Sequence, residues 1–411
     1  MNELLIKQAR VETGFEYEGN RIIGTKTELI DLYIENGRVK ELSSSIQKDG
    51  VEVIFANSKL LMPSFRDMHI HVDKTYFSGP WKACNPAPKG IFSRIEEEQS
   101  LLLKQLPFVQ DRAEAIIDWL LTQGHTHIRT HCNIDPVIGL KNLEATVRAF
   151  QRFQGQLTYD IVAFPQHGLL RSGVTPLMRE AMKSGATIVG GLDPASVDRN
   201  INKSLETMME IAVESGTGLD IHLHDPDTLG AFTFNILAEL TKAAKKEGQV
   251  TISHGVALAD LEHQDLIAMM DTLVDAGIDV TTTIPINRST IPVPILKSHG
   301  IEVSVGHDCL TDHWSPFGTG NTIEKLSILG ERFRLIDEYS LNQIWGYASG
   351  GVTPLNDLGE QVWPKVGDAA NIILLDAVCS AQAVARRTPV KTVIHQGIVV
   401  KNNELEEIHQ G

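Results

Sequence analysis

Residues 63–74 read Pro-Ser-Phe-Arg-Asp-Met-His-Ile-His-Val-Asp-Lys, a strand-like run with a His-x-His pair near its end. In an extended strand, residues i and i+2 point to the same face of the sheet. His69 and His71 can therefore direct two imidazoles at one point, which is the arrangement that a divalent metal needs. A His-x-His pair alone is also compatible with two unrelated surface histidines, so its partners decide the interpretation.

Five further polar clusters follow other apolar runs, and each contains a histidine. These clusters are Arg129-Thr130-His131, Pro165-Gln166-His167-Gly168, Asp220-Ile221-His222-Leu223-His224-Asp225, Ile252-Ser253-His254-Gly255 and Val305-Gly306-His307-Asp308. Including the first, eight apolar runs predict strands, near 61–68, 127–130, 158–164, 188–192, 219–221, 250–252, 279–282 and 302–305.

Helical stretches separate these strands, with apolar residues at three- and four-residue spacing, at 112–123, 144–153, 176–184, 201–215, 231–247 and 266–276. Glycine often closes them, as a left-handed C-cap would, at Gly124, Gly185, Gly216, Gly248, Gly277 and Gly300. Alternating strands and helices predict an α/β fold, a (β/α)8 TIM barrel, in which all strand ends meet at one mouth. A doubly wound open sheet is the alternative, but it would not gather polar residues from so many strands.

Both ends of the chain are rich in β-strand patterns. Near the N-terminus, strand-like runs at 4–6 and 30–34 precede Asn36-Gly37, a pair that favours a tight hairpin turn. Near the C-terminus, 370–375 and 390–400 show a strand–turn–strand pattern. We expect residues 1–60 and 366–411 to form one small β-sandwich domain, and residues 61–365 to form the barrel.

The composition favours a protein of the cytoplasm. The 411 residues carry a formal net charge of -15, which argues against nucleic acid and anionic membranes as partners. The four cysteines contain no CxxC pair, a pattern that fits a reducing compartment. No secretory signal and no membrane-spanning run is visible. We expect a homo-oligomer that acts on a small molecule.

On a barrel, the polar clusters assemble a metal site. His69 and His71 end strand 1, His222 ends strand 5, His254 ends strand 6 and Asp308 ends strand 8. Three imidazoles and a carboxylate suit one Zn²⁺ or Fe²⁺ ion and leave a position for water. A divalent ion lowers the pKa of such a water toward neutrality and so supplies a hydroxide nucleophile. Asp308 can accept its proton, and His254 can stabilise negative charge or carry a proton.

Longer motifs around these residues resemble the amidohydrolase superfamily, specifically its cytosine deaminase-like branch. They are Pro-x5-His-x-His-x-Asp (63–73), Gly-x-x-His-Ile-Arg-Thr-His (124–131), Ile-Val-Ala-Phe-Pro-Gln-x-Gly (161–168), Val-Thr-x-Ser-His (250–254) and Gly-His-Asp-x3-Asp-x-Trp-x-Pro-x-Gly-Thr-x-Asn (306–321). The resemblance implies one metal held by His69, His71, His222 and Asp308. It also implies that His254 polarises the attacking water and that Gln166 hydrogen-bonds the ring of a substrate such as a pyrimidine.

Three positions depart from the cytosine deaminase pattern. Asp225 replaces a glutamate that would protonate a ring nitrogen, and its side chain is one methylene shorter. Cys309 replaces an aspartate, so an acidic contact to an exocyclic amino group is missing. Lys74 extends the first motif to HxHxDK, which is similar to the triazine-degrading N-isopropylammelide aminohydrolases. A lysine at the mouth could meet an anionic or oxo-rich substrate.

Several neighbours allow two interpretations. His224 shares a strand face with His222, and we expect a contact to substrate or to a ligand rather than a further metal bond. His131 is expected to be buried behind the ligands. Strand 4 ends Gly190-Gly191-Leu192-Asp193-Pro194 without the lysine that a two-metal site usually carries, which favours one metal.

The expected rim of the pocket is less specific. Cys309 is expected to line the pocket rather than bind metal, and His307 to point away from the site. Trp314, with Asp312 and Asn321, either shapes the pocket or holds the loop after strand 8. Residues 81–92 are candidates for a lid, and 94–98 are expected to be a solvated helix face.

The sequence therefore predicts a metal-dependent hydrolytic deaminase acting on a ring C–N bond of a small N-heterocycle. One alternative is an aminohydrolase that releases an alkylamine from an N-alkyl triazine-like substrate. Another is a cyclic amide hydrolase, which usually needs two metals. A non-catalytic barrel that binds a metabolite would be expected to lack a ligand, whereas all four ligand positions are filled. Neither the substrate nor the choice between Zn²⁺ and Fe²⁺ follows from the sequence.

Overall fold

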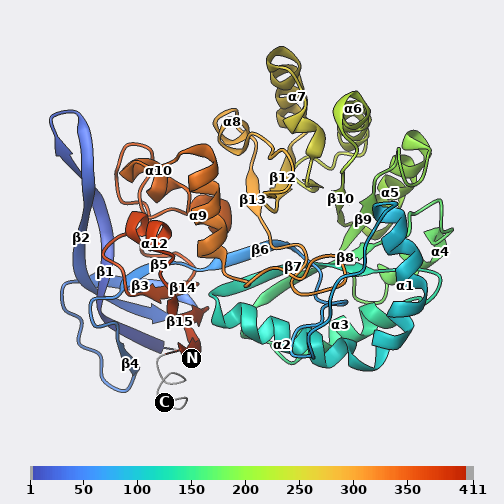
Figure 1. The fold of residues 1–411 in the computed structure, drawn as a ribbon. Coiled ribbons are helices and arrows are strands. Elements are labelled where there is room, and N and C mark those ends of the chain that lie inside the picture. The colour runs from blue at the N-terminus through green and yellow to red at the C-terminus, as the bar shows by residue number, and fades with distance from the viewer. Residues whose placement is uncertain (1–2, 404–411) are drawn as a thin grey trace.

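The structure is a computed structural model that describes residues 3–403. Figure 1 shows an array of strands surrounded by helices, with a smaller sheet beside it that is built from both ends of the chain. The terminal domain was predicted to include residues 1–2 and 404–411, which lie outside the described residues.

Eight parallel strands form the barrel in sequence order from β6 to β13, which confirms the predicted array. They are β6 Phe65–Ile70, β7 His125–Asn133, β8 Thr158–Phe164, β9 Ile188–Leu192, β10 Gly218–His222, β11 Val250–Ser253, β12 Ile278–Thr282 and β13 Val303–Val305. A parallel bridge between Ile70 and Asp308 joins the last strand to the first at the carboxyl ends. The sheet is therefore a nearly closed barrel rather than an open doubly wound sheet.

The first predicted strand, 61–68, is wrong because the chain changes sheets within it. Leu60–Pro63 forms β5, which pairs with β14 of the terminal sheet. The Ser64 N–H then donates to the carbonyl of Asn371, whereas the Phe65 N–H donates to Gly124 beside the barrel. One apolar run thus supplies a strand to each sheet, and only its second half, β6, leads to the histidines.

Helices surround the barrel, and all six predicted ones are present. The helices are α1 Ile91–Gln105, α2 Val109–Thr122, α3 Lys141–Gln151, α4 Thr175–Ala181, α5 Ile201–Ser215, α6 Asp227–Ala243, α7 His263–Asp275, α8 Val293–Ser298, α9 Thr322–Phe333, α10 Glu338–Gln343, α11 Gly346–Ser349 and α12 Ser380–Arg386, with short 3-10 turns at Leu106–Phe108 and Val256–Ala259. The six glycines expected at helix ends all have positive φ, as at Gly216 with φ 67°, where the left-handed conformation ends α5. Within residues 3–403, none of these helices is long and apolar enough to cross a membrane.

The terminal strands form a separate sheet, as expected, but not two facing sheets. Hydrogen bonds join them in the order β16-β15-β14-β5-β1-β2-β3, with β4 also paired to β1. The predicted Asn36-Gly37 turn is confirmed, since both residues have positive φ and Glu35 pairs with Arg38. The strands are β1 Glu3–Glu18, β2 Arg21–Glu35, β3 Arg38–Ser43, β4 Glu52–Phe55, β5 Leu60–Pro63, β14 Ile372–Leu375, β15 Val390–His395 and β16 Ile398–Asn402. The predicted sandwich is thus one sheet by hydrogen bonding, whose distant strands share an apolar cluster.

A buried carboxylate, Glu12 of β1, ties this sheet to α10 and α12. Its oxygens accept from Asn342 Nδ2 at 2.6 Å and from the Ser380 N–H. Burial raises the pKa of Glu12 from 4.5 to about 7, although these donors oppose the shift. The folded protein therefore holds this proton more tightly than the unfolded chain does.

The free energy of unfolding should consequently fall as pH rises from about 4.5 to 7, by up to about 3 kcal/mol from this group. Glu12→Gln cannot ionise, so it should be more stable than the wild type at pH 8 and should lose less stability between pH 5 and 8. Urea unfolding at both pH values measures the difference, with Glu16→Gln, at an exposed position of β1, as the matched control. Identical pH dependence in wild type and Glu12→Gln would contradict the assignment.

Candidate metal centre

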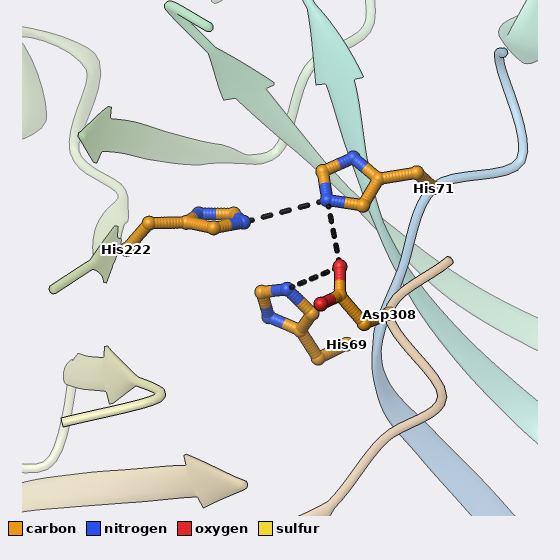
Figure 2. A group of neighbouring side chains, drawn as sticks. All are labelled: His69, His71, His222 and Asp308. Carbon is orange, nitrogen blue, oxygen red and sulfur yellow. Dashed lines mark hydrogen bonds and ion pairs between the residues drawn. The ribbon is translucent and has the colours of Figure 1, made fainter. Parts of the chain in front are cut away.

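Four predicted ligands converge at the carboxyl ends of β6, β10 and β13. His69, His71, His222 and Asp308 place one ligand atom each within 4.8 Å of all the others. His71 Nε2 lies 3.3 Å from Asp308 Oδ1 and 3.4 Å from His222 Nε2, while His69 Nε2 lies 3.7 Å from Asp308 Oδ1. Figure 2 shows the three rings and the carboxylate directed at a common centre.

These spacings fit one divalent ion held by all four residues. Two ligands that are each about 2.0–2.2 Å from the same ion cannot lie more than about 4.4 Å apart, and the three distances given above are all shorter than this. The His69 Nε2 atom is buried and has no hydrogen-bond partner, which is costly unless an ion or a water occupies the centre. The donor set and its geometry therefore fit Zn²⁺ or a similar ion.

Closure of the barrel places Asp308 beside the two strand-1 histidines. The Asp308 N–H donates to the His69 carbonyl at 2.7 Å, and its own carbonyl accepts from the His71 N–H at 3.0 Å. Gly306 allows this approach, because a Cβ atom there would lie 2.6–2.7 Å from His69. Asp308 itself has φ 62°, a left-handed conformation that is unusual for a residue other than glycine. The backbone contacts that close the barrel are thus the ones that assemble the ligands.

Polar groups behind the ligands fix the orientation of the two strand-1 rings. His69 Nδ1 is 2.8 Å from Ser253 Oγ, which in turn donates to Asp220 Oδ1 at 2.6 Å. His71 Nδ1 donates to the His131 carbonyl at 2.9 Å. Because each Nδ1 is occupied, each ring presents Nε2 to the centre, the arrangement seen when outer partners orient metal ligands.

The protonation states also suit metal binding. Burial, with a further contribution from nearby Lys74, lowers the pKa of His71, and burial among other imidazoles lowers the pKa of His222 well below its usual value. Burial alone would raise the pKa of Asp308, but contacts with His69 and His71 hold it well below its usual range. Neutral imidazoles and an ionised carboxylate are the forms that ligate metals.

His254 and His224 lie beside the four ligands. The His254 ring is 4.7 Å from that of His69 and 4.3 Å from that of His224. Its buried Nε2 has no hydrogen-bond partner, and its backbone has φ 71°. His224 Nδ1 instead lies 3.0 Å from Asp193 Oδ2, which turns it away from ligation through that atom. The structure therefore brings His254 to the centre with one nitrogen available.

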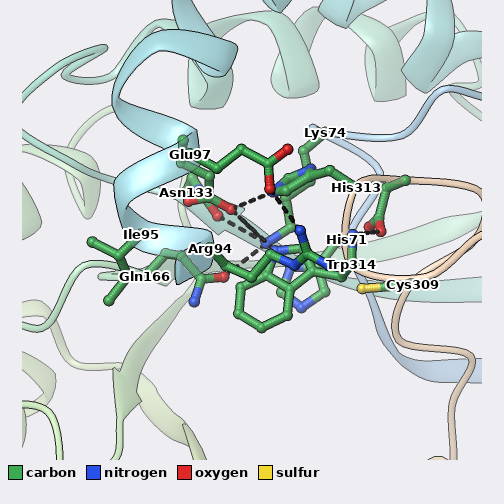
Figure 3. Close-up of polar contacts among 12 residues, drawn as sticks. His71, Lys74, Arg94, Ile95, Glu97, Asn133, Gln166, Cys309, His313 and Trp314 are labelled. Atoms are coloured by element: carbon green, nitrogen blue, oxygen red, sulfur yellow. Dashed lines mark hydrogen bonds and ion pairs between the residues drawn. The ribbon is translucent and has the colours of Figure 1, made fainter. Parts of the chain in front are cut away.

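Gln166, Lys74, Cys309 and Trp314 are also gathered near the ligands. Lys74 Nζ donates to Gln166 Oε1 at 2.8 Å and lies 5.4 Å from the centroid of the Trp314 ring. Cys309 Sγ is 3.6 Å from Asp308 Oδ1. Figure 3 shows these side chains meeting from separate segments. Lys74 is only 2% exposed, so it belongs to the wall of the site rather than to an open mouth.

The expectation of a solvated face at 94–98 is wrong, and it concealed Glu98. Glu98 has no exposed surface, and Arg94 is also buried. The signal was present in the sequence: on α1, Glu98 follows Ile95 and precedes Leu102 at helical spacing, so it shares the buried face of that helix. The acidic neighbours Glu96 and Glu97 made the run look polar on every side.

Asp225 and His307 were also predicted to lie at or near the site. Asp225 is buried, and its Oδ2 accepts from the Ala195 N–H at 3.2 Å; within residues 3–403 no hydrogen bond or ion pair joins it to the four ligands. Burial raises the pKa of Asp225. His307 bonds to Asp67 at 2.8 Å, as expected for a side chain that points away.

Asp312 and Asn321 hold the loop after β13. Asp312 Oδ1 accepts from the backbone N–H groups of Trp314 and Ser315, and Asn321 caps α9 by accepting from the Glu324 N–H. His131 is fully buried, with its ring 4.1 Å from that of His69. These contacts agree with supporting roles around the site.

Known proteins resemble this chain over nearly its whole length. A family model described as the amidohydrolase family matches residues 52–401. Uncharacterized protein YahJ of Escherichia coli (strain K12) is 42% identical over 394 residues, which cover 95% of this chain and 86% of the relative.

Two solved structures share the fold. N-isopropylammelide isopropylaminohydrolase from Burkholderia multivorans ATCC 17616 superposes with a TM-score of 0.86 at 27% identity, over 98% of this chain and 99% of the other. 5-Methylcytosine deaminase from Klebsiella pneumoniae, liganded with 5-fluorocytosine, gives a TM-score of 0.78 at 25% identity, over 97% of each chain. These matches confirm the resemblance that the motifs indicated.

Proposed function

Because this chain belongs to the amidohydrolase family, we propose that it is a metal-dependent hydrolase that releases ammonia or an amine from a ring C–N bond. The substrate is a small N-heterocycle such as a pyrimidine or a triazine, as in the cytosine deaminase-like enzymes. The observation that carries the proposal is the convergence of His69, His71, His222 and Asp308 beside an unpartnered His254.

Members of the amidohydrolase family bind a divalent metal, and these four residues would hold it here. When bound, such an ion supplies Lewis acidity and lowers the pKa of water toward neutrality. Asp308 is held ionised by its surroundings, so it can accept a proton from the attacking water at its second oxygen. His254 orients that water and stabilises the negative charge that develops on the oxygen as it attacks the ring carbon.

Asp225 is proposed to supply the proton to the ring nitrogen or the leaving group. Its raised pKa keeps a larger protonated fraction near neutral pH than an ordinary aspartate would have. It must release its bond to the Ala195 N–H, or share that oxygen, to reach the substrate. Gln166, Lys74, Cys309 and Trp314 are proposed to form the substrate-binding wall.

A single metal is proposed. At the end of β9 stand Leu192 and Asp193, so no lysine is available there as a bridge between two ions. His69, His131 and Asp220 form another group within 4.8 Å, but it shares His69 with the main centre. Metal analysis that finds two ions per chain would instead favour a cyclic amide hydrolase.

A screen for ammonia and amine release tests the function. The purified protein, loaded in turn with Zn²⁺ and Fe²⁺, is incubated with aminopyrimidines, aminotriazines, N-alkylaminotriazines, aminopurines and pterins. We expect turnover of at least one class that depends on the metal and is lost with a chelator. Release of an alkylamine would select the alternative reaction, which the similarity to N-isopropylammelide isopropylaminohydrolase favours. Turnover of cyclic amides alone would contradict the proposal.

Cytosine should be a poor substrate. Cys309 offers no negative charge to an exocyclic amino group, and Lys74 places a positive charge beside Gln166, which favours a ring with more oxo groups or an anionic substituent. We expect kcat/KM for cytosine to be at least about 100-fold below that of the best compound, about 2.7 kcal/mol of transition-state stabilisation. A steady-state panel measures this ratio. Cytosine ranking first would refute the argument, whereas a gain of cytosine turnover in Cys309→Asp would place the discrimination at that residue.

Three further expectations accompany the function. The chain is proposed to divide into 1–60 plus 366–411 and 61–365, to reside in the cytoplasm and to form a homo-oligomer. Limited proteolysis, cell fractionation and light scattering, respectively, test them. A monomeric mass in light scattering would refute the last.

A further inference from the structure

Glu98 is a fully buried carboxylate whose two oxygens contact four polar side chains. Its Oε1 accepts from His313 Nε2 at 2.8 Å and from Trp314 Nε1 at 3.1 Å. Its Oε2 lies 2.9 Å from His167 Nε2 and accepts from Asn133 Nδ2 at 3.2 Å. Both oxygens are therefore satisfied by side chains at the carboxyl end of the barrel.

The partners come from four separate segments. Asn133 ends β7, His167 follows β8, and His313 and Trp314 follow β13, while Glu98 itself lies on α1. Lys74, which follows β6, places Nζ 3.8 Å from Glu98 Oε1. Figure 3 shows Lys74, Asn133, Gln166, His313 and Trp314 converging on this region. Glu98 thus connects helix α1 to segments at the carboxyl ends of β6, β7, β8 and β13.

Lys74 carries this network to Gln166. An ammonium group only donates hydrogen bonds, so the atom of Gln166 at 2.8 Å must be the carbonyl oxygen. The amide nitrogen then points elsewhere, and within residues 3–403 it has no hydrogen-bond partner. It is free to donate to a ligand.

We propose that Glu98 is a positioning residue for the reaction proposed above: it fixes Lys74, and through Lys74 it holds Gln166 with its N–H groups toward the substrate. The proposal rests on that function. It also defines one side of the substrate, which must present a hydrogen-bond acceptor to Gln166. A ring carbonyl oxygen or an unprotonated ring nitrogen meets this requirement, whereas an exocyclic amino group does not.

Removal of the Glu98 charge should release this geometry. A buried ammonium that loses its carboxylate is poorly compensated, so Lys74 should turn away from Gln166, and the amide should lose its preferred orientation. Lys74→Met removes the same restraint. The two substitutions should therefore act on one interaction and be strongly non-additive.

The test is a kinetic cycle with the best substrate of the screen. We expect Glu98→Gln to lower kcat/KM roughly 30-fold, mainly through KM, because the lost contact binds the ground state and the transition state alike. In the Lys74→Met background the same change should cost less than about 3-fold. Metal content should remain that of the wild type, and Glu96→Gln, at an exposed position of the same helix, is the matched control.

A loss in the Lys74→Met background equal to that in the wild type would overturn the proposal. If Glu98→Gln does not fold, two other proteins still decide it: Lys74→Met, in which Glu98 keeps its contacts with Asn133, His167, His313 and Trp314, and the double variant, which removes both charges. A further fall of more than about 10-fold in the double variant contradicts the proposal. If no compound is hydrolysed, the proposed function fails, and a crystal structure of the Glu98→Gln or double variant then tests the positioning. Glu98→Gln is compared with the wild type, and an unchanged orientation of Gln166 overturns the proposal. The double variant is compared with Lys74→Met, and a difference in the orientation of Gln166 between these two proteins also overturns it.

Discussion

Replacement of Asp308 by alanine should reduce bound metal to below about a tenth of an ion per chain and lower kcat/KM by at least about 1000-fold. Asp308 is the one carboxylate among the four converging ligands, and its Oδ1 lies within 3.7 Å of both strand-1 histidines. Its loss leaves three imidazoles without a carboxylate and removes the proposed acceptor of the water proton. Binding and chemistry should therefore fail together.

Metal analysis after dialysis and steady-state kinetics measure the two effects. Asp271→Ala is the control, because Asp271 is exposed on α7 and, among residues 3–403, its side chain bonds only to His299 at the end of α8. Full turnover by Asp308→Ala with one ion bound would show that the metal centre is assigned wrongly. The fold should survive, since the backbone bonds between Asp308 and the first strand do not involve its carboxylate.

Replacement of His254 by glutamine should lower kcat about 100- to 1000-fold while metal content stays at the wild-type level. The His254 ring lies 4.7 Å from that of His69, but His254 is not among the four groups whose ligand atoms converge. Its unpartnered Nε2 is available to the attacking water or to the substrate. We therefore expect a loss in the chemical step rather than in metal binding.

The same metal analysis and a comparison of kcat with KM distinguish a loss in the chemical step from a loss of metal binding. His263→Gln, at an exposed position that begins α7, is the matched control. Loss of the metal would make His254 a ligand, and unchanged kcat would exclude it from the chemistry. Either result would require a different assignment of the residues around the water.

The predicted ligand set could be found from the sequence because it depends on the short spacing between each residue and the end of a strand. His69 and His71 are two residues apart on a strand, and the other ligands follow strands whose apolar runs are recognisable in the sequence. Parallel strands in a barrel bring these ends to one mouth whatever the details of packing. Convergence of His222 and Asp308 with the first pair needed only the correct number and order of strands.

Contacts made across the barrel were not predictable in this way. The split between β5 and β6 depends on which backbone receives the N–H groups of Ser64 and Phe65. The number of sheets at the termini depends on which strands β1 joins by hydrogen bonds, and β1 pairs with β2, β4 and β5. Neither choice changes the local pattern of apolar residues, so periodicity cannot distinguish them.

By itself, the sequence determined the number and order of the barrel strands and six of the twelve α-helices within residues 3–403. It also determined which four side chains converge at the proposed metal centre, with His254 beside them, because each of these features depends on short-range spacing. Only the tertiary structure decided that Lys74 is enclosed and that Glu98 is the group that holds it. A carboxylate in a charged helical run is usually solvated. The burial of Glu98 is instead compensated by donors from four distant segments. Such long-range compensation of a buried charge leaves no repeating signal along the chain.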